Sequence, residues 1–137
     1  MTGLPSLHDD FLISYEVDCK ARRIKLRAKR DARVEANRGL PDRAIVFEGV
    51  EGYHFENDAF ENIIFSLECV SVEQLLAAYG AQIAESYRQA GAPGPWAADL
   101  TSAAQWLKVR GMQAFELSSS YGLSGWILAR EFLVEQA

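Results

Sequence analysis

The residues best suited to acid–base or metal chemistry stand near the start of the chain. His8 is followed by Asp9 and Asp10, and an imidazole beside two carboxylates is a set of groups that could bind a metal or exchange a proton. The chain has one other histidine, His54, whereas hydrolases of the His-Asp type use several such residues spaced along helices. We therefore interpret the three residues as a polar lead-in to the first strand, and we predict no metal and no cofactor. A small hydrolase or metal-dependent enzyme using His8 is kept as one alternative function.

Basic residues are concentrated between Lys20 and Arg43, a segment with ten basic and three acidic residues, in a chain whose net charge is −5. Arg23, Lys25, Arg27 and Lys29 alternate along one predicted strand, so they are about 6.6 to 6.8 Å apart on one face. That spacing approaches the phosphate repeat of extended nucleic acid. Aromatic residues are not interleaved with this row, and its charges can be balanced by neighbouring carboxylates. A nucleic-acid or polyanion binder is therefore the runner-up function, ahead of the enzyme using His8.

Acidic and aromatic residues gather in the middle of the chain. Surfaces of this composition suit a basic protein partner, which acids steer and aromatic anchors hold. The predicted partner-binding residues are Glu48, Glu51, Tyr53, His54, Glu56 and Asp58, joined by Trp96 and Tyr121.

The elements that would position these residues begin with the stretch 44–70. Apolar residues alternate in Ala44–Glu48 and again in Ile63–Val70, which is typical of half-buried strands. Gly49 and Gly52 indicate a bend, and Tyr53 and Phe55 indicate a short further strand. The same alternation predicts a hairpin of two strands before residue 31, with a short turn at Cys19-Lys20-Ala21.

Two helices and a last hairpin are predicted after residue 70. Ser71 and Gln74 form a capping-box pattern before a helix over about 72–90, and a second helix follows over about 100–110. Residues 113–134 predict a C-terminal hairpin whose last strand runs from Trp126 to Val134.

The order of these elements predicts the fold class. Hairpins over 11–70, then helices, then a hairpin favour an α+β fold with an antiparallel sheet of about five to seven strands and two helices packed on one face. A length of 137 residues, 49% of them apolar, is enough for a single domain over 1–137.

Compartment is predicted from the beginning of the chain and from its cysteines. The opening residues lack a basic start followed by an apolar run, and no apolar run is long enough to span a membrane, so we expect a cytoplasmic protein without membrane contact. Cys19 and Cys69 follow no metal-ligand spacing, and we expect buried free thiols on strands; the sequence leaves open whether they pair.

Three short motifs carry a resemblance to a known group of proteins. His-Asp at residues 8–9 before a strand, Phe47-Glu48-Gly49-Val50 and Asn62-Ile63-Ile64-Phe65 look like motifs of small uncharacterised bacterial domains, some of which are similar to immunity proteins of polymorphic toxin systems. The resemblance covers about the first seventy residues. It implies a non-enzymatic protein that blocks a partner by binding, and it assigns no site residues. We therefore expect a bacterial protein-binding module.

Overall fold

The computed structural model describes residues 3–136 and contains eight strands, two α-helices and two short 3-10 helices. The strands are β1 (Phe11–Asp18), β2 (Arg23–Lys29), β3 (Arg43–Glu48), β4 (Gly52–Glu56), β5 (Asn62–Val70), β6 (Gln113–Tyr121), β7 (Ser124–Ala129) and β8 (Glu131–Gln136). The helices are α1 (Val72–Ala90) and α2 (Leu100–Val109), with short 3-10 turns at Glu35–Asn37 and Pro95–Ala98.

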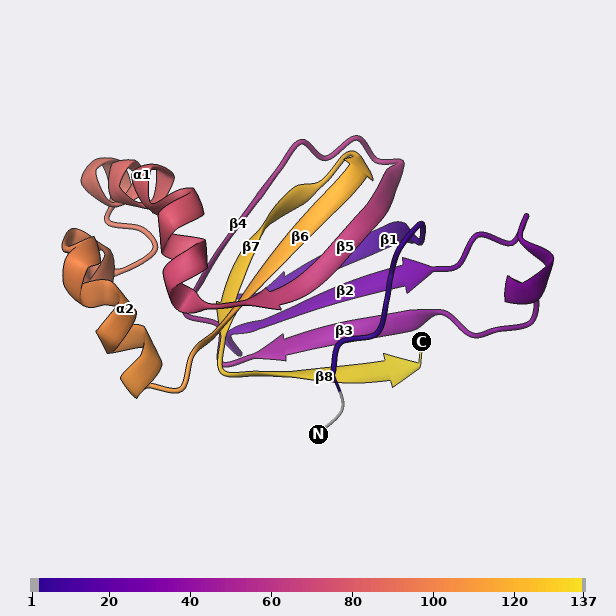
Figure 1. Cartoon of the computed structure of the whole chain (residues 1–137), viewed down its shortest axis with the longest axis horizontal. Coiled ribbons are helices and arrows are strands. Elements are labelled where there is room, and N and C mark those ends of the chain that lie inside the picture. Colours follow the sequence, from indigo (N-terminus) through magenta and orange to yellow (C-terminus); the bar gives the residue numbers. More distant parts are fainter. Residues whose placement is uncertain (1–2, 137) are drawn as a thin grey trace.

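All strands belong to one antiparallel sheet in the order β4-β7-β6-β5-β1-β2-β3-β8. β1 pairs with β5 only through Phe11 and Leu12, so the sheet separates there into two parts. We call β4-β7-β6-β5 the helix-side half and β1-β2-β3-β8 the outer half. Figure 1 shows that the strands of the two halves run in clearly different directions.

The two halves are also joined at the side away from the β1–β5 contact. There the chain crosses between the halves twice, once from β3 to β4 and once from β7 to β8, and the two crossings lie side by side. Residues 49–51 lead from β3 to β4, and Arg130 alone leads from β7 to β8. The backbone N–H of Arg130 donates to Glu48 O at 3.0 Å, and that of Glu51 donates to Leu128 O at 2.8 Å. These bonds keep the two strands paired through the bend, so the sheet is rolled around its own core.

The bend explains the one error in the predicted architecture. The predicted strand Trp126–Val134 is interrupted at Arg130, where the chain passes between the halves, so the sheet has eight strands instead of five to seven. The α+β class, the antiparallel sheet and the two helices are confirmed.

The first core lies between the two halves of the sheet. Its buried residues come from the inward faces of six strands, from the segment before β1, from the β3–β4 bend and from the β6–β7 turn. The largest fully buried members are Phe47, Phe115, Leu7, Ile24, Leu26, Ile45, Ile64, Leu117 and Leu123. Phe47 and Phe115 come from opposite halves and meet edge to face, with ring centroids 4.9 Å apart.

The segment before β1 is tied to β5. Asp9 N donates to Ile64 O, and Ile64 N donates to Asp10 O, both at 2.9 Å. These bonds place the Leu7 side chain in the first core. The Asp10 carboxylate accepts a 2.7 Å bond from Nη2 of Arg43 on β3, and both side chains are largely buried, at 7% and 15% exposure.

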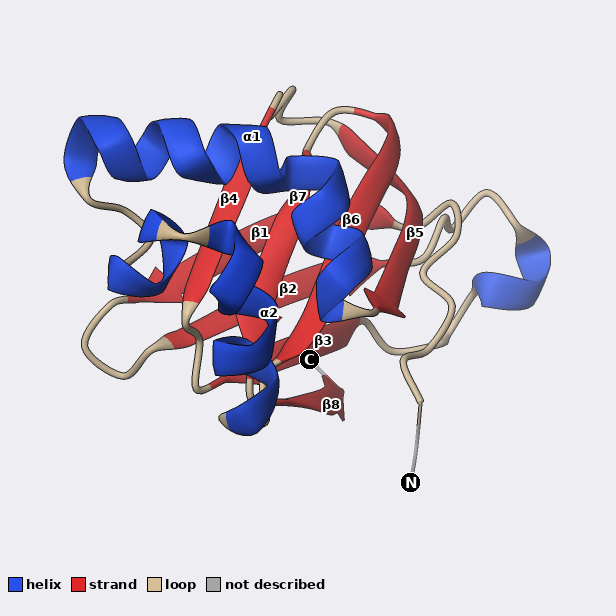
Figure 2. Ribbon diagram, turned by 60° about the vertical axis from the view of Figure 1, so that its left-hand side comes forward, coloured by secondary structure: helices blue, strands red, loops and turns tan. Residues whose placement is uncertain are grey.

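Both helices pack on the outward face of the helix-side half, as Figure 2 shows. Ser71 accepts a hydrogen bond from Gln74 N, and Ser71 N donates to the Gln74 side chain, so the predicted capping box is present. Gly91 closes α1 in the left-handed conformation, at φ 73°. The second core lies beneath the helices and contains Val72, Leu75, Ile83, Trp96, Ala97, Ala103, Leu107, Met112, Ala114, Trp126 and Leu128. None of the helices in residues 3–136 is long and apolar enough to cross a membrane.

The Asp10–Arg43 pair gives a test of the fold. Asp10→Asn leaves the Arg43 guanidinium largely buried without its counter-charge, so we expect the free energy of unfolding to fall by about 3 kcal/mol. Asp9→Asn is the matched control: Asp9 is next in the chain, has an exposed side chain and adopts φ 65°, which asparagine tolerates. Urea unfolding of both variants measures the difference, and equal losses would contradict a structural role specific to Asp10.

Candidate functional site

β4 and the two segments that flank it contain most of the predicted partner-binding residues. Glu51, Tyr53 and His54 line a cavity of about 410 Å³ at the beginning of β4. Glu56 and Asp58 follow at its end, where the chain turns towards β5. We call these two parts the β4 cavity and the 57–61 loop.

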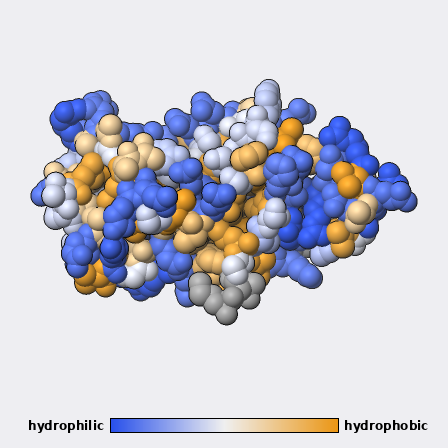
Figure 3. All heavy atoms as spheres, viewed as in Figure 1, coloured by the Kyte–Doolittle hydropathy of each residue, from blue (hydrophilic) through white to orange (hydrophobic). Residues whose placement is uncertain are grey.

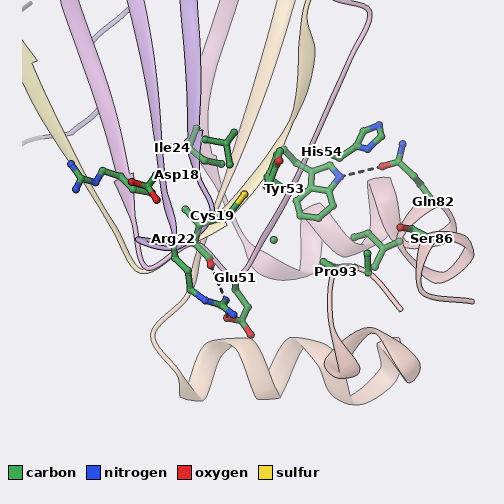
Figure 4. A pocket seen from close by; sticks show the side chains of 17 residues that line it. Asp18, Cys19, Arg22, Ile24, Glu51, Tyr53, His54, Gln82, Ser86 and Pro93 are labelled. Atoms are coloured by element: carbon green, nitrogen blue, oxygen red, sulfur yellow. Dashed lines mark hydrogen bonds and ion pairs between the residues drawn. The ribbon is translucent and has the colours of Figure 1, made fainter. Parts of the chain in front are cut away.

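The β4 cavity is formed by segments that are distant in sequence. Figure 4 shows side chains from the β1–β2 turn, the β3–β4 bend, α1 and the loop after α1 around one hollow. Its apolar lining comes mainly from Val17, Ile24, Val50, Ile83, Pro93 and Trp126, and its polar lining from Asp18, Cys19, Arg22, Arg23, Glu51, Tyr53, His54, Gln82 and Ser86.

Hydrogen bonds fix the walls of the cavity. Arg22 Nη1 donates to Val50 O at 3.3 Å and lies 3.5 Å from Glu51 Oε2, while Val50 N donates to Arg22 O at 3.0 Å. On the opposite side, Trp126 Nε1 donates to Gln82 Oε1 at 3.2 Å and so joins β7 to α1. An apolar lining with an ion pair and a few hydroxyl and amide groups can receive one side chain or a small organic group.

The 57–61 loop is held by a network centred on two side chains. Asp58 Oδ1 accepts bonds from Phe60 N at 2.8 Å and from Asn62 Nδ2 at 2.9 Å, and Asp58 Oδ2 accepts from the Tyr15 hydroxyl at 2.8 Å. Asn62 is buried, and its Oδ1 accepts from Ala59 N at 3.1 Å and from Leu123 N at 2.8 Å. The network therefore fixes the loop to β1 and to the β6–β7 turn.

This fixed loop presents Phe60 to solvent. The Phe60 side chain is 91% exposed, and its backbone is left-handed at φ 65°, a conformation that disfavours a bulky residue. Glu56 and Glu61 are exposed beside it in sequence. The result is an exposed aromatic side chain on a loop whose backbone is held in place, with acids on both sides of it along the chain.

The hydrogen bonds of the loop shift two pKa values. Bonds from the Asn62 side chain, the Phe60 backbone and the Tyr15 hydroxyl stabilise the Asp58 carboxylate and lower its pKa. The same carboxylate raises the pKa of Tyr15, first because it accepts the hydroxyl hydrogen bond. Both shifts favour the pair of protonation states that keeps the loop in place at neutral pH.

Three predicted partner-binding residues lie away from β4. Glu48 ends β3 in the outer half, where it pairs with Glu131. Tyr121 is exposed at the end of β6 and pairs with Ile63, close to the 57–61 loop in the sheet. The prediction that Trp96 binds a partner is wrong, because Trp96 is buried in the second core and stacked on Trp106, with ring centroids 6.5 Å apart.

The basic row lies on the outward face of β2 and is partly balanced by acids. Arg23 pairs with Asp18 on one side and Glu48 on the other, while Lys25 pairs with Glu16 and lies 3.6 Å from Glu135. Arg27 and Lys29 pair with the uncharged Ser14 and Phe11 of β1. The expected neighbouring carboxylates are present at one end of the row, where Glu16 lies opposite Lys25 and Asp18 opposite Arg23. An extended polyanion along β2 would meet carboxylates at that end. Figure 3 shows hydrophilic side chains dominating the end of the molecule where the β2–β3 loop lies.

The residues of the enzyme alternative, His8 and its neighbours, have structural contacts. The His8 ring lies 3.0 Å, at Nδ1, from Phe65 O and stacks edge to face on the Phe65 ring, and Asp10 pairs with Arg43. His8 and His54 lie on different segments, and the described residues contain no group of three or more His, Cys, Asp or Glu that could hold a metal ion. Cys19 and Cys69 are free, as expected, but both are exposed rather than buried, and Cys19 lies in the β1–β2 turn.

No family model, curated protein or solved structure matches this chain.

Two features of the site were not predicted. Phe60 lies in a polar stretch between Asp58 and Asn62. Its exposure depends on the bond from Tyr15 to Asp58 and the bond from Leu123 to Asn62, and periodicity reveals neither bond. The β4 cavity needs the β1–β2 turn beside α1, a tertiary contact between elements that were each predicted. An Asp-x-x-x-Asn spacing around an isolated aromatic residue was the available signal for the loop.

The Asp58 network predicts a pH dependence. Its folded-state pKa is lowered, so its contribution to stability is complete above the ordinary aspartate pKa of about 3.9 and is lost as the pH falls through the lowered value. We expect the stability difference between the wild type and Asp58→Asn to be constant near neutral pH and to vanish in acid. Urea unfolding as a function of pH measures it, with Glu61→Gln in the same loop as control. A difference that persists unchanged into strong acid would contradict the network.

Proposed function

We propose that this chain is a non-enzymatic protein-binding module of a bacterial cytoplasm, which blocks a basic partner by covering part of its surface. The proposed contact surface consists of the 57–61 loop, the exposed residues of β4 and the neighbouring Tyr121. The observation that carries the proposal is the exposure of Phe60 on a loop that the hydrogen bonds of Asp58 and Asn62 hold in place.

The energetics of Phe60 favour a partner. Burying a phenylalanine side chain contributes about 1.5 to 3 kcal/mol, and central aromatic anchors are typical hot spots. Because Asp58 and Asn62 already fix the loop, a partner would order little additional backbone on binding. A left-handed backbone at a bulky residue costs stability in the free protein, which a role in binding would explain.

The charges around the loop favour a basic partner. Glu56 and Glu61 are exposed, and the chain carries a net charge of −5. Carboxylates at the rim of an interface accelerate the encounter with a basic surface and discriminate against acidic ones. The β4 cavity lies at the other end of the same strand, so one partner could insert a side chain there while it covers Phe60.

The two alternatives receive less support. A polyanion along Arg23, Lys25, Arg27 and Lys29 would lie beside Asp18, Glu16 and Glu48. For an enzyme, His8 would need a second catalytic group, and Asp10 is engaged with Arg43.

Phe60→Asn separates binding from stability. Asparagine tolerates the left-handed backbone, so we expect unfolding to cost about 0.5 to 1 kcal/mol more than in the wild type. Loss of the ring should weaken partner binding roughly tenfold or more. The control is Val109→Ala, which removes an apolar side chain that is 70% exposed at the end of α2.

The measurement is affinity capture from nuclease-treated lysate of the bacterium, with wild type, Phe60→Asn and Val109→Ala as baits, followed by mass spectrometry and titration of the captured protein. The proposal predicts one protein that the wild type and Val109→Ala retain and Phe60→Asn loses. Equal retention by all three baits, or recovery that disappears with nuclease treatment, contradicts it.

A further inference from the structure

β8 forms an open edge of the sheet. It pairs with β3 and with no other strand, so one side of its backbone has N–H and C=O groups without a strand partner among residues 3–136. Figure 1 shows β8 at the margin of the outer half. Such edges are templates for the addition of another strand unless the sequence protects them.

The side chains of β8 protect it only in part. The strand contains no proline and no lysine, and its centre is the apolar run Phe132-Leu133-Val134. Leu133 and Val134 lie on opposite faces and are 47% and 43% exposed, because no further strand covers them. A strand laid beside β8 would cover part of both side chains.

Carboxylates dominate the outward face at this edge. The register places Glu48 directly opposite Glu131, and two like charges in that position repel each other. Glu135 lies two residues beyond Leu133 on the same face and is 3.6 Å from Lys25, a loose contact between partly exposed groups. The edge therefore offers an acid, an apolar residue and an acid at alternate positions.

We propose that β8 accepts an extended segment of a protein partner as an added strand, with basic, apolar and basic side chains at alternate positions. The basic side chains would face the Glu48–Glu131 pair and Glu135, and the apolar one would lie beside Leu133. Backbone hydrogen bonds supply affinity in this mode and alternate side chains supply specificity. This surface goes beyond the proposed function, since neither Phe60 nor β4 takes part.

The same charges disfavour a second copy of this chain as the occupant. Two β8 strands related by a two-fold axis must pair residues of the same face. With the axis at Leu133, Glu131 of one copy faces Glu135 of the other; with the axis at Val134, Leu133 faces Glu135. The first arrangement opposes like charges and the second buries a carboxylate against leucine, so the edge discriminates against itself and in favour of a basic strand.

A pair of blocked peptides tests the proposal on the full chain. Acetyl-Thr-Lys-Thr-Val-Thr-Lys-Thr-amide presents the required pattern, and its counterpart with both lysines replaced by glutamate is the control. We expect saturable amide shifts in β8 and β3 with the lysine peptide in a nuclear magnetic resonance titration. The glutamate peptide should bind roughly tenfold more weakly, as expected for the loss of two exposed ion pairs.

The charge-swapped variant Glu131→Lys/Glu135→Lys should reverse this preference, whereas Phe60→Asn should bind the lysine peptide as the wild type does. This second result separates failure of the β8 proposal from failure of the Phe60 surface. Equal binding of both peptides, shifts confined to the 57–61 loop, or no saturable shift of β8 at millimolar peptide overturns the proposal.

Discussion

The fold depends on the paired crossing of two strands from one half of the sheet to the other. At this bend the backbone N–H of Arg130 donates to Glu48 O and that of Glu51 donates to Leu128 O. These bonds hold the β3–β4 connection and the β7–β8 connection together as both cross between the halves. Gly49 makes the crossing possible: it has φ 65°, and an added Cβ would come within 2.8 Å of the Arg130 Cβ. The first core forms between the halves that this bend brings face to face, and β4 and β8 become edges on opposite sides of it.

Surface features follow from that geometry. β4 leaves the bend beside the β1–β2 turn, which creates the cavity, and ends in the loop that Asp58 and Asn62 fix. β8 leaves the same bend in the other half and carries its carboxylates to the margin of the sheet. An acidic stretch that is continuous in sequence is thereby divided between two surfaces, with Glu48 on one and Glu51 on the other.

Local patterns predicted the elements well, and their limits have physical causes. The strands predicted from alternation in 11–18 and 63–70 are present, and so is the capping box at Ser71, because these signals depend on neighbouring residues. The alternation itself is interrupted by irregular pairing in both strands, so that Ile13 and Phe65 are exposed. Arg130 was visible as a polar interruption among apolar residues, yet its role as the point where the strand changes partners depends on β3, more than eighty residues earlier in the sequence. Trp96 and Phe60 show the same limit for single residues. Both are aromatic residues outside the α-helices and the strands, and only tertiary contacts bury the first and leave the second exposed.

The position of β8 has a consequence for the order of folding. β3 is completed early in synthesis, but its outer neighbour, β8, is the last strand of the sheet to be made. β7, which is the partner of β4, is made immediately before β8. The apolar strand Arg43–Glu48 must therefore remain with one open side while about eighty further residues are added. Sheets built from such distant pairings fold slowly, because long loops must close before the contacts that reward closure can form. During that interval the nascent chain exposes an edge of Ile45, Val46 and Phe47, and it is more prone to aggregation than the finished molecule.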